Sequence, residues 1–99
     1  MSAFVDLDSS SRPQIGRHFR LQWEEVQKAW VLLYPEGMVK LNGSAGEILR
    51  HCDGQRTVAE IVTELEKLFG TTGLEADVRA FFEIASKQGW VEQAPSAAA

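Results

Sequence analysis

The sequence predicts an α+β fold of the winged helix-turn-helix type, in which a three-stranded antiparallel β meander is followed by three α-helices. The first observation is that apolar residues alternate or run together up to Asn42 and then repeat at helical spacing. The second is that three Ser or Thr residues after Asn42 each precede a Glu by three positions, which is typical of a helix N-terminus. A small sheet packed on three helices, two of them joined by a short turn, gives this fold class.

The predicted strands differ in how many faces they bury. Phe19, Leu21 and Trp23 alternate with polar residues, so the first strand has one solvated face. Residues 29–34 (AWVLLY) form an unbroken apolar run, which is typical of a central strand covered on both faces. The connections between the strands are short, which favours an antiparallel meander. The expected strands are roughly residues 17–22, 28–34 and 38–42.

The third strand is predicted to lie at the edge of the sheet. A Pro-Glu-Gly turn precedes it, in which we expect Gly37 to supply a positive φ. Val39 and Leu41 then fall on one face, while Met38 and Lys40 fall on the other. An edge strand carries unpaired N–H and C=O groups, which are a hazard unless they are covered or used. We expect this edge to be used in binding.

The three helices are predicted from their start and stop signals. The expected capping boxes are Ser44 with Glu47, Thr57 with Glu60, and Thr72 with Glu75. The expected stops are Asp53-Gly54, Gly70 and Gly89.

The third helix carries an apolar stripe with two adjacent phenylalanines. Neighbours on a helix lie about 100° apart, so one ring can face the core while the other borders a groove. The spacing does not tell which of Phe81 and Phe82 does which. The stripe consists of Leu74, Val78, Phe81, Phe82 and Ala85.

The two ends of the chain have little to bury. Residues 1–13 are polar and Ser-rich, so we expect a disordered lead-in there, and residues 93–99 are expected to form a flexible tail. Residues 14–92 between them are the predicted domain, and its last residues, 90–92, are extended and suit a short final strand.

The composition describes a small acidic protein with a net charge of -4. Its 99 residues, 44% of them hydrophobic, suffice for one modest core. No apolar run approaches the ~20 residues of a membrane helix, and the N-terminus lacks the basic start and apolar block of a signal peptide, so we expect a cytoplasmic protein with no membrane partner. Cys52 is the only cysteine, which excludes an internal disulfide, and its place on a helical stripe predicts a buried thiol.

The charge distribution argues against nucleic-acid binding. A surface that faces phosphates gains its affinity from clustered Lys and Arg. Residues 57–92, which would hold the recognition helix, instead carry seven acidic residues and three basic ones. No nucleic-acid partner is therefore expected.

Few residues suit catalysis. His18 is predicted on the polar face of a strand and His51 near a helix end, and both are expected to be solvated. Glu24 and Glu25 are adjacent in a turn, so their side chains point apart and nothing apolar raises a pKa. Residues 43–46 (GSAG) lack the lysine and the length of a P-loop. We expect no catalytic residue, no metal and no cofactor.

A set of segments spread over about residues 17–92 has the pattern of a known family. The matching segments are residues 20–23 (RLQW), 29–42 (AWVLLYPEGMVKLN), 45 (A), 47–49 (EIL), 52–54 (CDG), 57–61 (TVAEI) and 89–90 (GW). Together they resemble the PqqD family, small peptide-binding proteins of pyrroloquinoline quinone (PQQ) biosynthesis. The long block at residues 29–42 is the specific part of this resemblance.

The resemblance implies the winged-helix-like fold called the RiPP recognition element, which holds the leader part of ribosomally made precursor peptides. It implies binding of the precursor peptide PqqA and its presentation to PqqE, a radical SAM enzyme that cross-links a glutamate and a tyrosine of that peptide. The peptide would add as an extra strand beside the third strand, in a groove walled by the third helix. Carried over by position, the peptide-binding residues are Met38, Val39, Lys40, Leu41, Val78, Phe81, Phe82 and Ala85. The family resemblance implies a non-catalytic chaperone.

A second hypothesis uses the same edge for self-association. We expect a monomer, but the third strand could also pair with another copy of the chain, in an edge-to-edge or strand-exchanged dimer. The substitution Val39→Pro removes a backbone N–H from this strand and is expected to abolish peptide binding.

Overall fold

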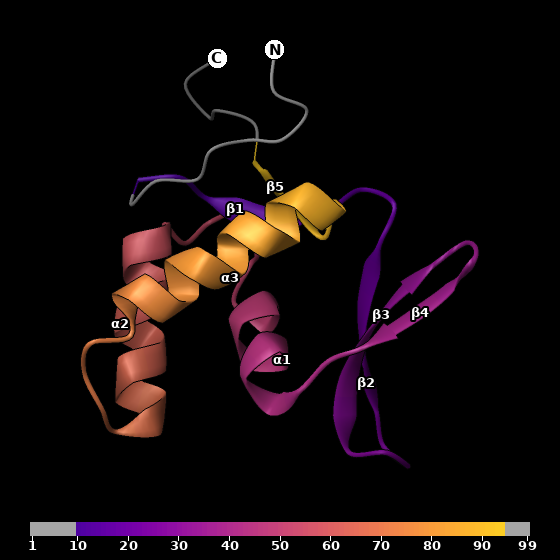
Figure 1. Cartoon of the computed structure of the whole chain (residues 1–99), viewed down its shortest axis with the longest axis horizontal. Helices are drawn as coiled ribbons and strands as arrows, with labels where there is room; N and C mark the ends of the chain where they lie inside the picture. Colours follow the sequence, from indigo (N-terminus) through magenta and orange to yellow (C-terminus); the bar gives the residue numbers. More distant parts are fainter. Residues whose placement is uncertain (1–9, 95–99) are drawn as a thin grey trace.

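The computed structural model describes residues 10–94, which form two small sheets and three helices (Figure 1). The larger sheet is antiparallel with the strand order β2-β3-β4. The predicted α+β architecture, a three-stranded meander followed by three helices, is confirmed. The elements are β1 (Pro13–Ile15), β2 (Arg20–Glu24), β3 (Ala29–Tyr34), β4 (Gly37–Lys40), α1 (Gly43–Arg50), α2 (Val58–Phe69), α3 (Glu75–Gln88) and β5 (Val91–Gln93).

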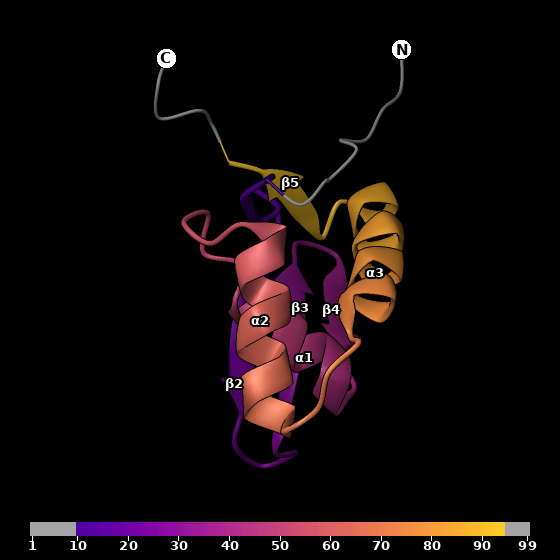
Figure 2. The ribbon, with the colours of Figure 1, turned by 90° about the vertical axis from the view of Figure 1, so that its left-hand side faces the viewer.

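The central strand β3 ties the sheet to the helices. Leu32 of β3 is fully buried and lies between Leu21 of β2 and Val39 of β4. On this face Trp30 packs against α1 so closely that a Cβ added to Gly46 would lie 2.7 Å from Trp30 Cδ1. Helix α1 therefore lies between the sheet and α2, as Figure 1 shows, while Figure 2 shows α3 on the β4 side of the sheet.

The turn before β4 differs from its expected form. Gly37 does not have a positive φ. Instead it pairs with Tyr34 across a two-residue loop whose residues both have negative φ. Lys28, in the turn just before β3, has a positive φ of 55°. The β3–β4 hairpin is thus closed without a left-handed glycine.

One of the first two predicted capping boxes is confirmed and the other is wrong. Thr57 accepts the N–H of Glu60 at its side chain, and the Glu60 carboxylate accepts the N–H of Thr57 in return. Helix α1, however, begins at Gly43, because the side chain of Asn42 accepts the N–H of Ala45 at 2.7 Å. Asn42 therefore holds the N-cap position that was predicted for Ser44.

The third predicted capping box, Thr72 with Glu75, is also wrong. The N-cap of α3 is Leu74, and no side chain of its own caps the helix. The carboxylate of Glu66, at the end of α2, accepts the N–H of Leu74 at 3.0 Å instead. The start of α3 is thus fixed by the preceding helix.

Residues 10–13, which fall within the expected lead-in, pack against the rest of the domain. Residues 1–9 of the expected lead-in lie outside the described residues, but Ser11 and Pro13 are buried, and the C=O of Ser11 accepts the N–H of Val58 at 2.9 Å. Strand β1 pairs with β5, which confirms the short final strand and adds a partner that was not predicted. Gly16 passes so close to Gly89 that a Cβ would lie 2.0 Å from the Gly89 carbonyl oxygen.

Candidate functional site

Strand β4 lies at an edge of the sheet, and among residues 10–94 its only strand partner is β3. The N–H of Leu41 donates to the C=O of Trp30 at 3.0 Å, which fixes the phase of the ladder. Because hydrogen-bonded and non-hydrogen-bonded pairs alternate in an antiparallel ladder, Val39 also bonds toward β3. Met38 and Lys40 therefore direct their N–H and C=O groups away from β3, to the open edge.

This phase changes the expected effect of Val39→Pro. The N–H of Val39 faces its partner Leu32 in β3, so proline at this position would break the hairpin itself. At Lys40 proline would remove an N–H that points outward, where a sheet tolerates it. Lys40 is therefore the position at which the edge can be tested without breaking the hairpin.

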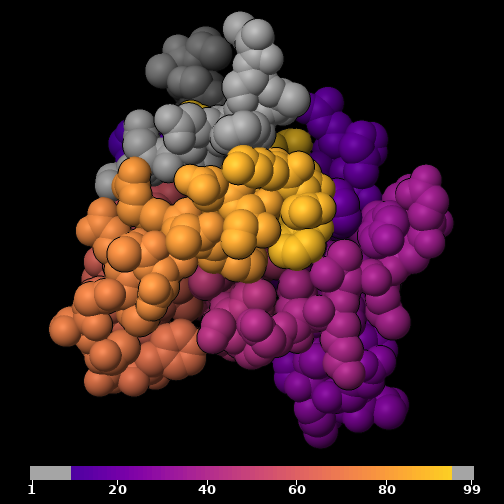
Figure 3. All heavy atoms as spheres, in the orientation of Figure 1, coloured from indigo at the N-terminus to yellow at the C-terminus, as the bar shows by residue number. Residues whose placement is uncertain are grey.

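A groove of about 400 Å³ lies beside the open edge, between β4, α1 and α3. Figure 3 shows the β3–β4 hairpin standing out from the body of the molecule beside the C-terminal half of α3. Four of the residues predicted for binding, Val39, Lys40, Leu41 and Phe81, line this groove. The groove is lined by Val39, Lys40, Leu41, Asn42, Ser44, Ala45, Ile48, Asp77, Phe81, Ile84 and Trp90.

Three of the predicted wall residues face the core instead. Val78, Phe82 and Ala85 are 3%, 2% and 0% exposed and belong to the hydrophobic core. The stripe of α3 that borders the groove consists of Asp77, Phe81 and Ile84. It is the core stripe moved back by one residue, which is a rotation of about 100° on a helix. Of the two adjacent phenylalanines, Phe81 therefore borders the groove and Phe82 is buried.

Met38 does not line the groove with its side chain. It is 50% exposed. Its side chain lies on the face of the sheet opposite to Val39, because successive residues of a strand point to opposite faces. At this position the edge offers backbone groups, and the neighbouring Val39 lines the groove.

The end of the groove at Trp90 is held by backbone bonds. The N–H of Gly16 donates to the C=O of Trp90 at 2.8 Å, and the N–H of Trp90 donates to the C=O of Ala85 at 2.9 Å. The rings of Phe81 and Trp90 are tilted at 41° with centroids 6.4 Å apart. Trp90 was not assigned to the site from the sequence, because its partner strand β1 was not predicted.

The nucleophilic and titratable residues that the sequence singled out lie elsewhere. Cys52 is buried, as predicted; its thiol donates to the C=O of Ile48 at 3.3 Å, and burial raises its pKa. His51 was expected to be solvated, but it is 7% exposed, and its Nδ1–H donates to the C=O of Glu47 at 2.6 Å. Its ring thus satisfies a backbone C=O group in the last turn of α1. Neither Cys52 nor His51 lines the groove.

Two further observations concern the described part of the chain. Within residues 10–94, no three His, Cys, Asp or Glu residues lie grouped so that they could hold a metal ion. Within the same residues, every helix is too short or too polar to cross a membrane.

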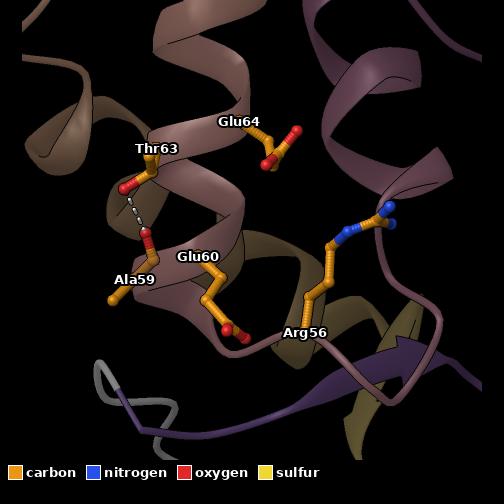
Figure 4. Close-up of a pocket in the computed structure, with 5 residues that line it drawn as sticks. All are labelled: Arg56, Ala59, Glu60, Thr63 and Glu64. Atoms are coloured by element: carbon orange, nitrogen blue, oxygen red, sulfur yellow. Dashed lines mark hydrogen bonds between the residues drawn. The ribbon is translucent and has the colours of Figure 1, made fainter.

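A different hollow, of about 290 Å³, lies on the exposed face of α2. Figure 4 shows Arg56, Glu60 and Glu64 around it. Two of the charged groups there already have partners: Arg56 donates to Asp53 at 3.3 Å, and Glu60 belongs to the capping box. Its lining residues come from α2 and the loop before it and from no strand, so it lacks the open β4 edge that adjoins the groove.

Comparisons with known proteins agree with this architecture. The profile described as coenzyme PQQ synthesis protein D (PqqD) matches residues 29–91. The PqqA binding protein of Azotobacter vinelandii is 52% identical over 81 residues, which are 81% of this chain and 88% of the relative. The PqqA binding protein of Methylococcus capsulatus is 47% identical over 89 residues, which are 90% of this chain and 96% of the relative.

Two solved structures share the fold. The solution NMR structure of the PqqD truncation of Methylobacterium extorquens PqqCD, described as a functional and stand-alone RiPP recognition element, has a TM-score of 0.72 at 28% identity and covers 87% of this chain and 94% of that one. The heterocyclase TruD has a TM-score of 0.62 at 27% identity, covering 84% of this chain and 11% of that one. The fold is thus that of a RiPP recognition element, with an open sheet edge beside a helix-walled groove. The chain belongs to the PqqD family.

Proposed function

We propose that the protein binds the precursor peptide PqqA as an added strand on β4 and presents it to the radical SAM enzyme PqqE, without catalysing a reaction itself. The observation that carries this proposal is the outward-facing edge of Met38 and Lys40 directly beside the groove. The relatives named PqqA binding protein, about half identical to this chain, support the choice of peptide.

In this proposal the two parts of the site have separate tasks. Backbone bonds from Met38 and Lys40 hold an extended peptide regardless of its sequence. Every second side chain of that peptide faces the groove, on the face of the sheet that carries Val39 and Leu41. There it contacts Phe81 and Ile84 of α3, so that the groove selects apolar side chains.

Three of the predicted binding residues are buried and affect the groove by holding α3 in place. Val78, Phe82 and Ala85 anchor α3 in the core and thereby set the distance between α3 and β4. They are positioning residues for the groove. Their truncation would weaken binding through the fold of the domain.

A titration of isotope-labelled protein with PqqA tests this proposal. The amide signals of Met38, Lys40 and Phe81 are expected to shift most. Shifts confined to the exposed face of α2, at Glu60 and Glu64, would place the peptide elsewhere and overturn the proposal. For presentation, the cross-linking of PqqA by PqqE is compared with and without the protein, and the same rate in both reactions would refute this part.

The same edge also supports the second hypothesis, pairing with another copy of the chain. Sedimentation at several concentrations tests it. A dimer that uses β4 would dissociate as PqqA is added, because both partners need the N–H and C=O groups of Met38 and Lys40. A dimer that persists at saturating peptide would use another surface.

A further inference from the structure

A second, smaller pocket adjoins the groove at the start of α3. We propose that it receives one large apolar side chain of the same peptide, from a residue on the N-terminal side of the segment that pairs with β4. This inference rests on the proposed function, because it takes the strand docked on β4 as its starting point. It adds a binding site for a specific kind of side chain.

The pocket has a volume of about 220 Å³ and lies where α1, the end of α2 and the start of α3 meet. Ile48, Leu65 and Val78 are buried, and Phe69 is 51% exposed. A half-exposed aromatic ring beside buried apolar residues is an apolar surface that a ligand can cover. The lining residues are Ser44, Ile48, Leu65, Phe69, Thr71, Leu74, Asp77 and Val78.

The loop that closes the pocket is held in place by Glu66. The C=O of Glu66 accepts the N–H of Thr71 at 3.0 Å, and its carboxylate accepts the N–H of Leu74 at 3.0 Å. Both Thr71 and Leu74 line the pocket. The pocket is therefore formed before a ligand arrives.

The pocket and the groove form one continuous path. They share Ser44, Ile48 and Asp77 as lining residues. Along α3 the path runs from Ile84 to Leu74, which at about 1.5 Å per residue is about 15 Å. An extended peptide rises about 3.3 Å per residue, so about five residues cover this distance. One short peptide segment thus reaches both sites.

The size of the pocket selects the occupant. A cavity of about 150 Å³ lined by Leu, Ile and Phe holds a benzene molecule, so about 220 Å³ accommodates one leucine or aromatic side chain. A strand or helix of a second copy is too large for it. The pocket lies past the Asn42 end of β4, and all strand pairs of residues 10–94 are antiparallel. A peptide paired antiparallel with β4 reaches this end with its N-terminal side.

The test compares two neighbouring residues of α2 in the full chain. Phe69 and Leu68 are 51% and 52% exposed, but only Phe69 lines the pocket. In calorimetric titrations with PqqA, Phe69→Ala is expected to weaken binding about tenfold, because the bound side chain loses its aromatic contact. The matched control Leu68→Ala is expected to change the affinity less than about twofold. Equal effects of the two substitutions would overturn the inference.

A second variant and a second readout keep the test independent of folding. Thr71→Glu places a charge at the pocket and is expected to weaken binding at least as much as Phe69→Ala. Circular dichroism checks that both variants are folded. An alanine scan of PqqA in turn identifies the occupant. Replacing one apolar residue before the paired segment with alanine should weaken binding to the wild-type protein but not to the Phe69→Ala variant. If no peptide residue behaves in this way, the pocket does not bind the peptide.

The outcomes separate this inference from the proposed function. If PqqA still shifts the amides of Met38 and Lys40 while Phe69→Ala matches Leu68→Ala, only the pocket assignment fails. If the wild-type protein does not bind PqqA at its β4 edge, the proposed function fails as well. If Phe69→Ala changes the sedimentation of the peptide-free protein, the occupant is a second copy of the chain and the inference is overturned.

Discussion

The substitution Lys40→Pro removes one outward N–H from β4 and leaves the bonds between β3 and β4 in place. A bound peptide then loses one hydrogen bond, and its carbonyl is left without a donor, which costs about 1–3 kcal/mol in addition to about 0.5–1.5 kcal/mol for the bond itself. We expect PqqA binding to weaken by about 1.5–4.5 kcal/mol, which is roughly 10-fold to 2000-fold.

Two controls isolate the backbone effect. Lys40→Ala removes the side chain but keeps the N–H, so its affinity for PqqA should stay within about threefold of the wild type. Val39→Pro removes the N–H that faces β3, so it should lower the free energy of unfolding by about 2–4 kcal/mol, through the lost bond and the carbonyl of Leu32 left without its donor. Calorimetry measures the affinities, and chemical denaturation measures the stabilities.

One pattern of results would exclude strand addition at β4. If Lys40→Pro is folded by circular dichroism and binds PqqA as well as Lys40→Ala does, the peptide does not use this N–H. Strand addition at β4 would then be wrong, even if the protein binds PqqA through another surface.

Three further predictions concern the groove and the fold. Phe81→Ala should weaken PqqA binding by about 1–2 kcal/mol in calorimetry, whereas Phe82→Ala should lower the free energy of unfolding by about 3–5 kcal/mol in denaturation, because only Phe82 is buried. Thr57→Ala should lower the free energy of unfolding by about 0.5–2 kcal/mol, and no change would contradict the capping box. The N–H of Gln55 lowers the pKa of Asp53, so the stabilisation by this carboxylate is present above the unfolded pKa, about 3.9, and is lost as the pH falls through the folded pKa. The stability difference between the wild type and Asp53→Ala should therefore shrink below about pH 4, and a constant difference would contradict the assignment.

The sequence predicts which strand and helix form the site, but not which backbone groups of the strand face outward or which face of the helix borders the groove. The alternation around Val39 and the apolar run of β3 are enough to place an edge strand. Which N–H groups face outward depends on the pairing register, which is set by the two-residue loop after Tyr34. On α3, Phe81 and Phe82 are equally apolar, and only the packing of the helix decides which of them is buried.

The other differences arise where a residue outside the recognised local pattern satisfies the backbone groups at the start of a helix. Asn42 precedes Ser44 and takes the N-cap of α1, and Glu66 from the previous helix takes the N–H of Leu74. A local pattern such as Thr72 with Glu75 carries no information about such a competitor. Strand β1 was missed for a similar reason: its pairing partner lies at the other end of the chain.

Because the open edge of β4 is short, apolar contacts have to supply most of the free energy of peptide binding. Met38 and Lys40 together offer two N–H and two C=O groups, worth about 2–6 kcal/mol at about 0.5–1.5 kcal/mol for each bond. Ordering a disordered peptide costs about 2–5 kcal/mol, which offsets most of that gain. A micromolar complex needs about -8 kcal/mol, so three or more side chains, at about 1.5–3 kcal/mol each, have to be buried. The groove at Phe81 and the pocket at Phe69 together provide sites for them, so peptides that lack apolar residues at this spacing should bind weakly even with the edge intact.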